Sequence, residues 1–305
     1  MKAARWAGRV NGAGASSTKD NRPARTNHSE TLAAAADTLD VAKGERMTQP
    51  FQHREHRRPV IRRAVCALCL APDELKASHV IPEFVYSEMY DDAHRFNVLT
   101  VVEGRRDRFE QKGLREPLLC GKCEQKFSGW ERYASLIFKG GAKGVSGNRE
   151  QNVVTVNGIR YQDFKLFLLS ILWRAGVASG DFFQHVELGP HQERLRQMLM
   201  NGDPGAFNQY ACVIFGMTMG EGQLAGLMIQ PTRANILGHA AYHFVIPGFK
   251  LVYFVSKQRL GKPWNQFVLQ EDGNMTFQVR SAMELPTLHG FMSEFERQGR
   301  TPPLG

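Results

Sequence analysis

The 305-residue sequence has no long uncharged apolar run, and it has no apolar stretch near its N-terminus of the kind that a secretory signal needs. Its most apolar segment, residues 164–178, is shorter than the roughly 20 residues that cross a bilayer, and it contains Lys165 and Arg174. These absences exclude a membrane-spanning helix and disfavour export. We therefore expect a cytoplasmic protein with no membrane partner.

Cysteine is scarce, and four of the five cysteines stand in two Cys-x-x-Cys pairs. Without a secretory signal, such pairs favour metal binding over disulfides, although a redox motif or unrelated thiol pairs stay open. Zn²⁺ prefers four soft ligands in a tetrahedron. The 50 residues between the pairs exceed a compact zinc finger and imply an insertion. We predict one structural Zn²⁺ bound by Cys66, Cys69, Cys120 and Cys123.

Most of the basic excess of the chain lies at one end. Residues 1–63 contain 13 Lys/Arg and 6 Asp/Glu, whereas residues 64–145 contain 12 of each. Few large apolar residues occur in the segment 1–60, so it cannot bury enough surface to offset its ordering entropy. We interpret it as a disordered basic tail, with Met47 as an alternative start of the protein.

The rest of the chain divides into a cysteine-bearing module at 61–145 and a separate α+β domain at 146–305. An Asn157-Gly158 pair inside the alternating stretch 152–161 predicts a hairpin. The apolar periodicity predicts an α+β fold. The expected helices are 123–140, 161–179, 189–202 and 283–299. The expected strands are 210–219, 224–230, 240–256, 265–270 and 274–279.

The stretch "ASHVIPEF" at 77–84 raises the question of what His79 does. It could be a buried structural residue, a metal ligand or a general base that takes a proton from water. Glu124 follows the last cysteine at the start of a predicted helix, where the helix dipole favours a carboxylate. Glu131 lies seven residues further on, on the same helix face.

Three motifs together resemble one family: "CALC" at 66–69, "SHVIP" at 78–82 and "LLCGKCE" at 118–124. Over roughly residues 64–140 the chain is similar to the HNH endonucleases, which have a treble-clef (ββα-metal) zinc module. The resemblance implies that His79 is the general base and that Glu124 binds a catalytic Mg²⁺ or Mn²⁺. It also implies that nucleic acid, with DNA preferred, is the substrate.

The pattern departs from the family at two points. Ser78 stands where a second ligand of the catalytic metal is expected, and serine is a poor ligand for a divalent cation. Arg115 and Glu116 occupy the positions where the family has asparagine, although Glu116 could add an oxygen ligand. Two other readings therefore stay open. The protein could be an inactive zinc module that binds nucleic acid or protein, or a structural zinc clamp for the C-terminal region.

Three arginines lie in the insertion between His79 and the second cysteine pair. Phosphate contact and simple balancing of surface charge are equally compatible with their placement. The candidate nucleic-acid-binding residues are Arg105, Arg106 and Arg108.

The tail interpretation predicts that a chain beginning at Met47 folds and melts like the full chain, because residues 1–46 contribute no packing. Thermal unfolding of the two proteins measures this, and limited proteolysis should remove the tail first. A large drop in Tm on truncation would show that the tail packs against the domains.

Overall fold

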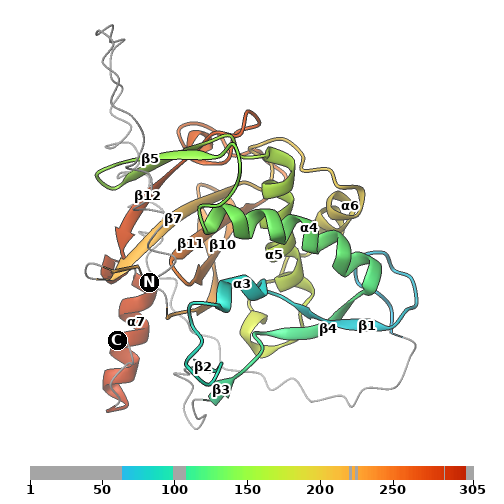
Figure 1. The fold of residues 1–305 in the computed structure, drawn as a ribbon, viewed down its shortest axis with the longest axis horizontal. Helices are drawn as coiled ribbons and strands as arrows, with labels where there is room; N and C mark the ends of the chain where they lie inside the picture. Colours follow the sequence, from blue (N-terminus) through green and yellow to red (C-terminus); the bar gives the residue numbers. More distant parts are fainter. Residues whose placement is uncertain (1–63, 99–107, 220–221, 224–225, 285, 300–305) are drawn as a thin grey trace, which may run out of the picture.

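The fold is taken from a computed structural model (Figure 1). It describes residues 64–98, 108–219, 222–223, 226–284 and 286–299. The predicted tail at 1–60 and the alternative start at Met47 lie outside these residues. Among the helices of the described ranges, none combines the length and the apolar character that a bilayer crossing requires. The chain mixes helices with a large sheet, so the α+β class is confirmed at this level.

The largest sheet has eight strands. Seven follow the order β5-β6-β12-β7-β11-β10-β9, and β8 pairs with β7. All neighbouring strands are antiparallel except β12 and β7, which are parallel. The strands are β5 Ser146–Glu150, β6 Val153–Asn157, β7 Cys212–Met219, β8 Gly222–Gln223, β9 Ile229–Ile236, β10 His239–Ile246, β11 Phe249–Val255 and β12 Met275–Ser281.

The two faces of this sheet are both apolar. Successive side chains of a strand point to opposite faces, so Ile214 enters one core cluster while Phe215 enters another. The first face packs against helix α5 (Tyr161–Val177), where the Tyr253 hydroxyl donates to the Leu168 carbonyl oxygen at 3.1 Å. Helix α5 is therefore buried over most of its length.

Four of the helices correspond to those expected from the periodicity. They are α4 Gly121–Phe138, α5 Tyr161–Val177, α6 Pro190–Asn201 and α7 Pro286–Arg297. Helix α6 starts with Pro190 in its first turn and ends at Gly202, whose φ of 69° is the left-handed conformation that glycine adopts without strain. The described residues also contain three short 3-10 helices, at Asp181–Phe183, Trp264–Phe267 and Ala282–Glu284.

The cysteine pairs flank a smaller unit. Strands β1 (Leu75–His79) and β4 (Arg115–Cys120) form a two-stranded antiparallel sheet, and α4 follows β4 directly. The insertion between them holds the short helix α3 (Glu83–Tyr86) and the pair β2 (Phe96–Val98) and β3 (Arg108–Glu110). Figure 1 shows β1 and β4 side by side, with α4 beside α5 above them.

The hairpin expected at 152–161 is wrong. Strand β6 pairs with the preceding strand β5, and the chain turns at Gly158 toward α5 instead of into another strand. Gly158 has a φ of 81°, and a Cβ there would lie 2.1 Å from the Gly144 carbonyl oxygen. The N–H of the following residue, Ile159, donates to the Gly273 carbonyl oxygen. The glycine is thus needed for a close backbone approach, not for a hairpin turn.

Three of the expected strands also differ. In place of the strand expected at 224–230, β9 begins only at Ile229 and runs to Ile236. The stretch 240–256 is two strands, β10 and β11, because the chain reverses at Pro247 and Gly248, where φ is 78°. The stretch 265–270 begins in a 3-10 helix, and Val268 makes only an isolated bridge. The stretch 265–270 departs from a strand because Trp264 and Phe267 bury their rings in the core on the second face of the sheet.

One hydrophobic cluster joins the cysteine-bearing module to the large sheet. It runs from Cys66 through Phe127 of α4 and Trp173 of α5 to Phe277 of β12. The predicted domain boundary near residue 145 is therefore crossed by packed side chains. The division into independently folding parts stays a prediction.

A buried lysine gives the fold a testable pH dependence. Lys165 of α5 is 2% exposed, and its Nζ donates to the carbonyl oxygens of Tyr210 and Phe207 at 3.0 and 3.3 Å. Burial lowers the pKa of Lys165 to about 8, although the nearby Cys212 thiol opposes the shift. Between pH 8 and the unfolded value of 10.5 the unfolded chain binds more protons, so stability should rise with pH.

The variant Lys165→Met should remove this slope while keeping the aliphatic stem. We expect the unfolding free energy of the wild type, minus that of the variant, to increase by about 2 kcal/mol from pH 8 to pH 10. Chemical denaturation at each pH measures the difference. Lys143→Met, at an exposed position, is the control and should run parallel to the wild type. Parallel curves for Lys165→Met would show that Lys165 stays charged in the fold.

Candidate metal centre and histidine site

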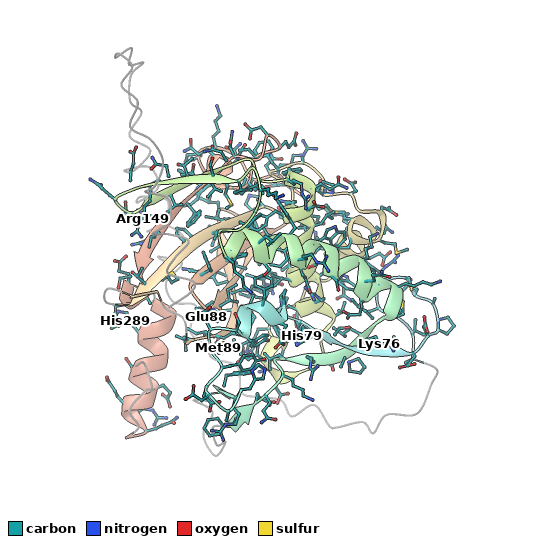
Figure 2. All side chains as sticks on the ribbon, in the orientation of Figure 1. Lys76, His79, Glu88, Met89, Arg149 and His289 are labelled. Atoms are coloured by element: carbon teal, nitrogen blue, oxygen red, sulfur yellow. The ribbon has the colours of Figure 1, made fainter. Side chains whose placement is uncertain are left out.

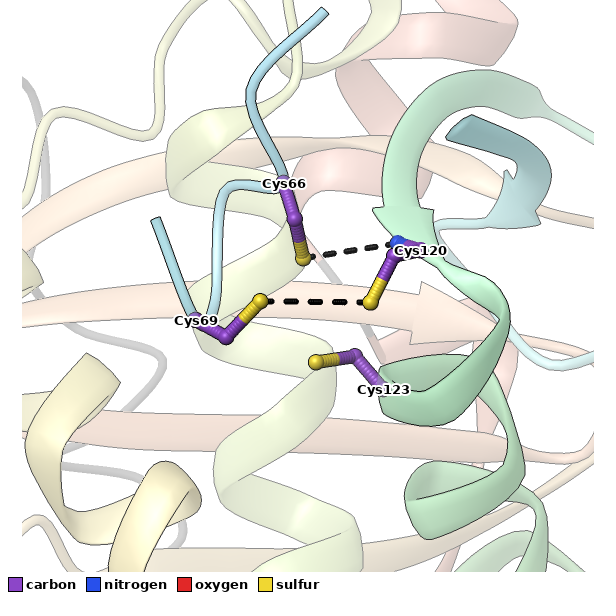
Figure 3. A group of neighbouring side chains, drawn as sticks. All are labelled: Cys66, Cys69, Cys120 and Cys123. Atoms are coloured by element: carbon purple, nitrogen blue, oxygen red, sulfur yellow. Dashed lines mark hydrogen bonds between the residues drawn. The ribbon is translucent and has the colours of Figure 1, made fainter. Parts of the chain in front are cut away.

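The four paired cysteines come together in space. Their sulfur atoms all lie within 4.8 Å of one another, and the Cys69 and Cys120 sulfurs are 3.9 Å apart. Cys66 and Cys69 come from the turn before β1, whereas Cys120 caps α4 and Cys123 lies in its first turn. Figure 3 shows the four sulfurs turned toward a common centre. A cysteine cluster able to bind metal is thus confirmed.

The cluster fits a tetrahedral zinc ion. With Zn–S bonds of about 2.3 Å, the sulfurs of a tetrahedron stand about 3.8 Å apart, close to the observed Cys69–Cys120 separation. All four cysteines are free thiols. Burial raises the pKa of Cys66, but N–H groups of Cys120, Cys69 and Leu68 outweigh it and hold the pKa near 7. Four protein ligands leave no open position, so such a site would be structural.

A bulge in β4 fastens the first cysteine turn to the hairpin. Lys76 pairs with Leu119 but Ala77 pairs with Pro117, so Leu118 is an extra residue in β4. Its carbonyl oxygen is therefore available to accept the N–H of Ala67, at 2.9 Å. This bond ties the Cys66–Cys69 turn to the strand that leads into α4.

Ser78 has a role inside the hairpin. It is 1% exposed, its hydroxyl donates to the Lys76 carbonyl oxygen at 3.3 Å, and it accepts the Leu119 N–H at 3.1 Å. Leu119 adjoins the bulge, and the hydroxyl satisfies this N–H where a carboxylate would add a buried charge. The position at which the family resemblance implies a metal ligand is therefore occupied by a structural hydrogen bond.

His79 ends β1, opposite Arg115 of β4. Its Nε2 lies 2.9 Å from the Lys112 carbonyl oxygen and 2.5 Å from Oε2 of Glu83. Because both partners are acceptors, Nε2 carries the hydrogen, and Nδ1 holds the lone pair when the ring is neutral. Nδ1 has no hydrogen-bond partner among the described residues. It is also not among the buried polar atoms that lack a partner, so it is accessible to solvent.

Glu124 lies at the other end of the hairpin from His79. It is in the first turn of α4, and Leu75, at the start of β1, pairs with Cys120 beside it. Four residue steps along β1, about 13 Å, separate this end from His79. One carboxylate oxygen of Glu124 is buried without a hydrogen-bond partner. The structure thus places Glu124 near the cysteines and not beside His79.

The helix carboxylate near His79 is Glu131. A single guanidinium nitrogen of Arg174 donates to the His79 carbonyl oxygen at 2.6 Å and to Oε1 of Glu131 at 2.7 Å. Arg174 is 1% exposed and also bonds the Ser170 hydroxyl and carbonyl. A buried arginine therefore occupies the space between the end of β1, α4 and α5.

The described residues do not fit a second divalent cation. Among the described residues, one group of three or more His, Cys, Asp or Glu side chains brings its ligand atoms together, and that group is the cysteine tetrad. Glu116 accepts two bonds from Ser179 and one from the N–H of Gly180, and Glu131 is paired with Arg174. The catalytic Mg²⁺ or Mn²⁺ bound by Glu124 stays a prediction without a ligand set.

The side chains of the three candidate phosphate-binding arginines lie outside the residues that the structure describes. Arg105 and Arg106 are not among the described residues, and only the backbone of Arg108 is described, at the start of β3. The sequence reasoning missed two residues that contact His79. Glu83 stands four positions after it, a spacing that could have drawn attention, whereas nothing in the sequence pointed to Arg174.

The chain was compared with protein-family models, with curated proteins and with solved structures, and no match was found. The resemblance to HNH endonucleases therefore rests on the sequence motifs of this chain.

The cysteine geometry predicts one tightly bound zinc per chain. Cys120→Ser should release it and unfold the segment around the hairpin and α4, because metal binding supplies folding free energy to a unit of this size. Elemental analysis and circular dichroism measure the two effects. The fifth cysteine, Cys212, is buried in β7 away from the cluster, so Cys212→Ser should keep its zinc. A zinc-free wild type would contradict the assignment.

Proposed function

We propose that the protein is a phosphodiester hydrolase acting on nucleic acid, DNA in the first place, with His79 as its general base. In this proposal residues 64–140 are a treble-clef HNH-like module whose zinc is structural. The observation that carries the proposal is the state of the His79 ring. Its Nε2 is engaged by two acceptors, and its Nδ1 is left open to solvent.

An imidazole held in this way can perform one half of phosphodiester hydrolysis. The Nδ1 lone pair accepts a proton from a water molecule while the water oxygen attacks phosphorus. The P–O bond to the leaving sugar oxygen then breaks, and that oxygen takes up a proton from solvent water. Glu83 and the Lys112 carbonyl keep the ring in place as it becomes an imidazolium. The described residues assemble no second group of converging metal ligands, so the step rests on the imidazole and its two acceptors.

Two basic residues lie beside the histidine in the hairpin. Arg115, the cross-strand partner of His79, and Lys112, whose carbonyl holds the ring, are both exposed. Lys76, labelled on the same strand in Figure 2, lies nearer the cysteine end of β1 and is instead paired with Glu74. A phosphodiester approaching Nδ1 would meet Arg115 and Lys112. We propose that Arg105, Arg106 and Arg108, whose side chains lie outside the description, supply further phosphate contacts. Such contacts position a nucleic acid without reading its sequence.

An inactive zinc module that binds nucleic acid or protein is the second candidate. It is favoured by Ser78, whose hydroxyl is used inside the hairpin, and by the pairing of Glu131 with Arg174. Both observations remove oxygen ligands that a metal-dependent nuclease would need near His79.

A structural clamp is the third candidate. The Arg196 guanidinium of α6 donates to the Leu68 carbonyl oxygen in the cysteine turn, and Glu116 bonds the loop after α5. The zinc module is thus fastened to the C-terminal region at several points. This fastening is compatible with catalysis, so it does not by itself distinguish the clamp from the enzyme.

The proposal predicts that His79→Ala abolishes cleavage while leaving zinc content and Tm nearly unchanged. A general base contributes about 10²–10⁴-fold to rate. Plasmid DNA, single-stranded DNA and RNA should each be tested with Mg²⁺, with Mn²⁺ and with chelator. His185→Ala, at an exposed loop position far along the chain, is the matched control and should keep full activity.

Two outcomes would contradict the enzyme reading. If the wild type cuts none of these substrates under any condition, the module is a binding or clamping element. If His79→Ala loses zinc or unfolds, the histidine is structural.

A further inference from the structure

A carboxylate contacts the Nε2 side of the His79 ring, opposite the nitrogen that is left without a partner. Oε2 of Glu83 lies 2.5 Å from Nε2, and Oε1 of Glu83 accepts a hydrogen bond from the Tyr90 hydroxyl at 2.8 Å. The Glu83 side chain is therefore held at both oxygens. A hydrogen bond between an imidazole N–H and an ionised carboxylate is about twice as strong as a neutral one.

The backbone between the two residues holds them in register. Val80 and Ile81 are almost completely buried, and the Val80 N–H donates to the Leu114 carbonyl oxygen at 3.0 Å. Pro82 then restricts φ to −56° at the residue before α3, which begins at Glu83. The spacing of four residues in "HVIPE" thus follows from a buried, constrained turn and not from two flexible surface side chains.

We infer that Glu83 is a positioning residue for His79, which holds the ring through Nε2–H so that Nδ1 is the nitrogen presented to substrate. This inference deepens the proposed function and rests on it for its catalytic consequence. Arg174 fixes the backbone of His79 through its carbonyl oxygen. Glu83 and the Lys112 carbonyl fix its ring.

The charges around the ring give Glu83 a second effect. Arg115 faces His79 from β4, Lys112 lies in the turn before β4, and Arg174 reaches it from α5 with Glu131 of α4 as its counter-ion. Tyr86 of α3 contributes a ring 6.4 Å away. Among these groups Glu83 is the anion in direct contact with the imidazole, and it stabilises the positive charge that the ring acquires on taking a proton.

Tyr90 supports the carboxylate. Burial and the adjacent Glu83 raise the pKa of Tyr90 to about 12, so its hydroxyl remains a donor at every pH at which the protein would be assayed. The expected order of importance is therefore Glu83 first and Tyr90 second, because Tyr90 acts on the ring only through Glu83.

The test compares Glu83→Gln, which keeps the shape of the side chain but removes its charge, with Glu83→Ala, which removes both. Nuclear magnetic resonance of the imidazole in the substrate-free protein reads the contact directly. We expect the His79 Hε2 signal of the wild type to lie downfield, as for a charge-assisted hydrogen bond. It should move upfield in Glu83→Gln and further in Glu83→Ala, where part of the neutral ring becomes protonated at Nδ1.

The kinetic arm uses the same variants on whichever nucleic acid the wild type cleaves. The kcat should fall by up to about 100-fold in Glu83→Ala, since small misplacements of a catalytic group have effects of this size. The KM should be unchanged, because Glu83 contacts the base and not the substrate. Glu74→Gln removes a carboxylate that pairs with Lys76 just before His79 on the chain, and it should leave both parameters unaltered.

The two proposals can fail separately. An Hε2 signal that is the same in wild type and both Glu83 variants overturns the positioning role, as does an unchanged kcat in Glu83→Ala. A wild type that shows the expected signals but hydrolyses no nucleic acid overturns the proposed function, and leaves Glu83 as the residue that holds the ring.

Discussion

The convergence of four sulfur atoms sets the geometry of the region from the first cysteine turn to α4. Cys66 and Cys69 precede β1 and Cys120 and Cys123 begin α4, so one cluster closes a loop of 50 residues. Loop closure costs conformational entropy that the small β1–β4 sheet could not offset alone. A zinc ion bound to four thiolates can supply that free energy. The placement of His79 at the far end of the hairpin follows from this anchor.

A buried guanidinium connects the zinc module to the rest of the protein. Arg174 lies in α5, yet it bonds the last residue of β1 and a carboxylate of α4. Its burial is tolerated because acceptors from His79, Glu131 and Ser170 surround it and the Phe127 ring lies 5.4 Å from its central carbon. The orientation of the candidate base thus depends on a helix that follows the zinc module in sequence.

Sequence reasoning succeeded where the chemistry is local and failed where register decides. Two Cys-x-x-Cys pairs predict a metal cluster because each pair needs only one turn to aim two sulfurs. Likewise, an apolar stripe was enough to predict helices such as α5. The structure did not support the expected pairing of His79 with Glu124. Glu124 lies at the opposite end of the hairpin from His79, and Glu131, seven residues further along α4, is the carboxylate that comes near the end of β1. The Leu118 bulge and the burial of the Ser78 hydroxyl cannot be read from a motif.

The position of Arg174 also bears on how such a module could be transferred between proteins. A stretch ending near residue 145 would retain the four cysteines, the hairpin and α4, but not the cation that neutralises Glu131 and caps the strand end. It would also expose the face of α4 that carries Phe127 and Trp130, which is buried in the full chain. Grafting the motif elsewhere would therefore require a surrogate for α5, and any relative that lacks an arginine at this point needs another way to hold the histidine.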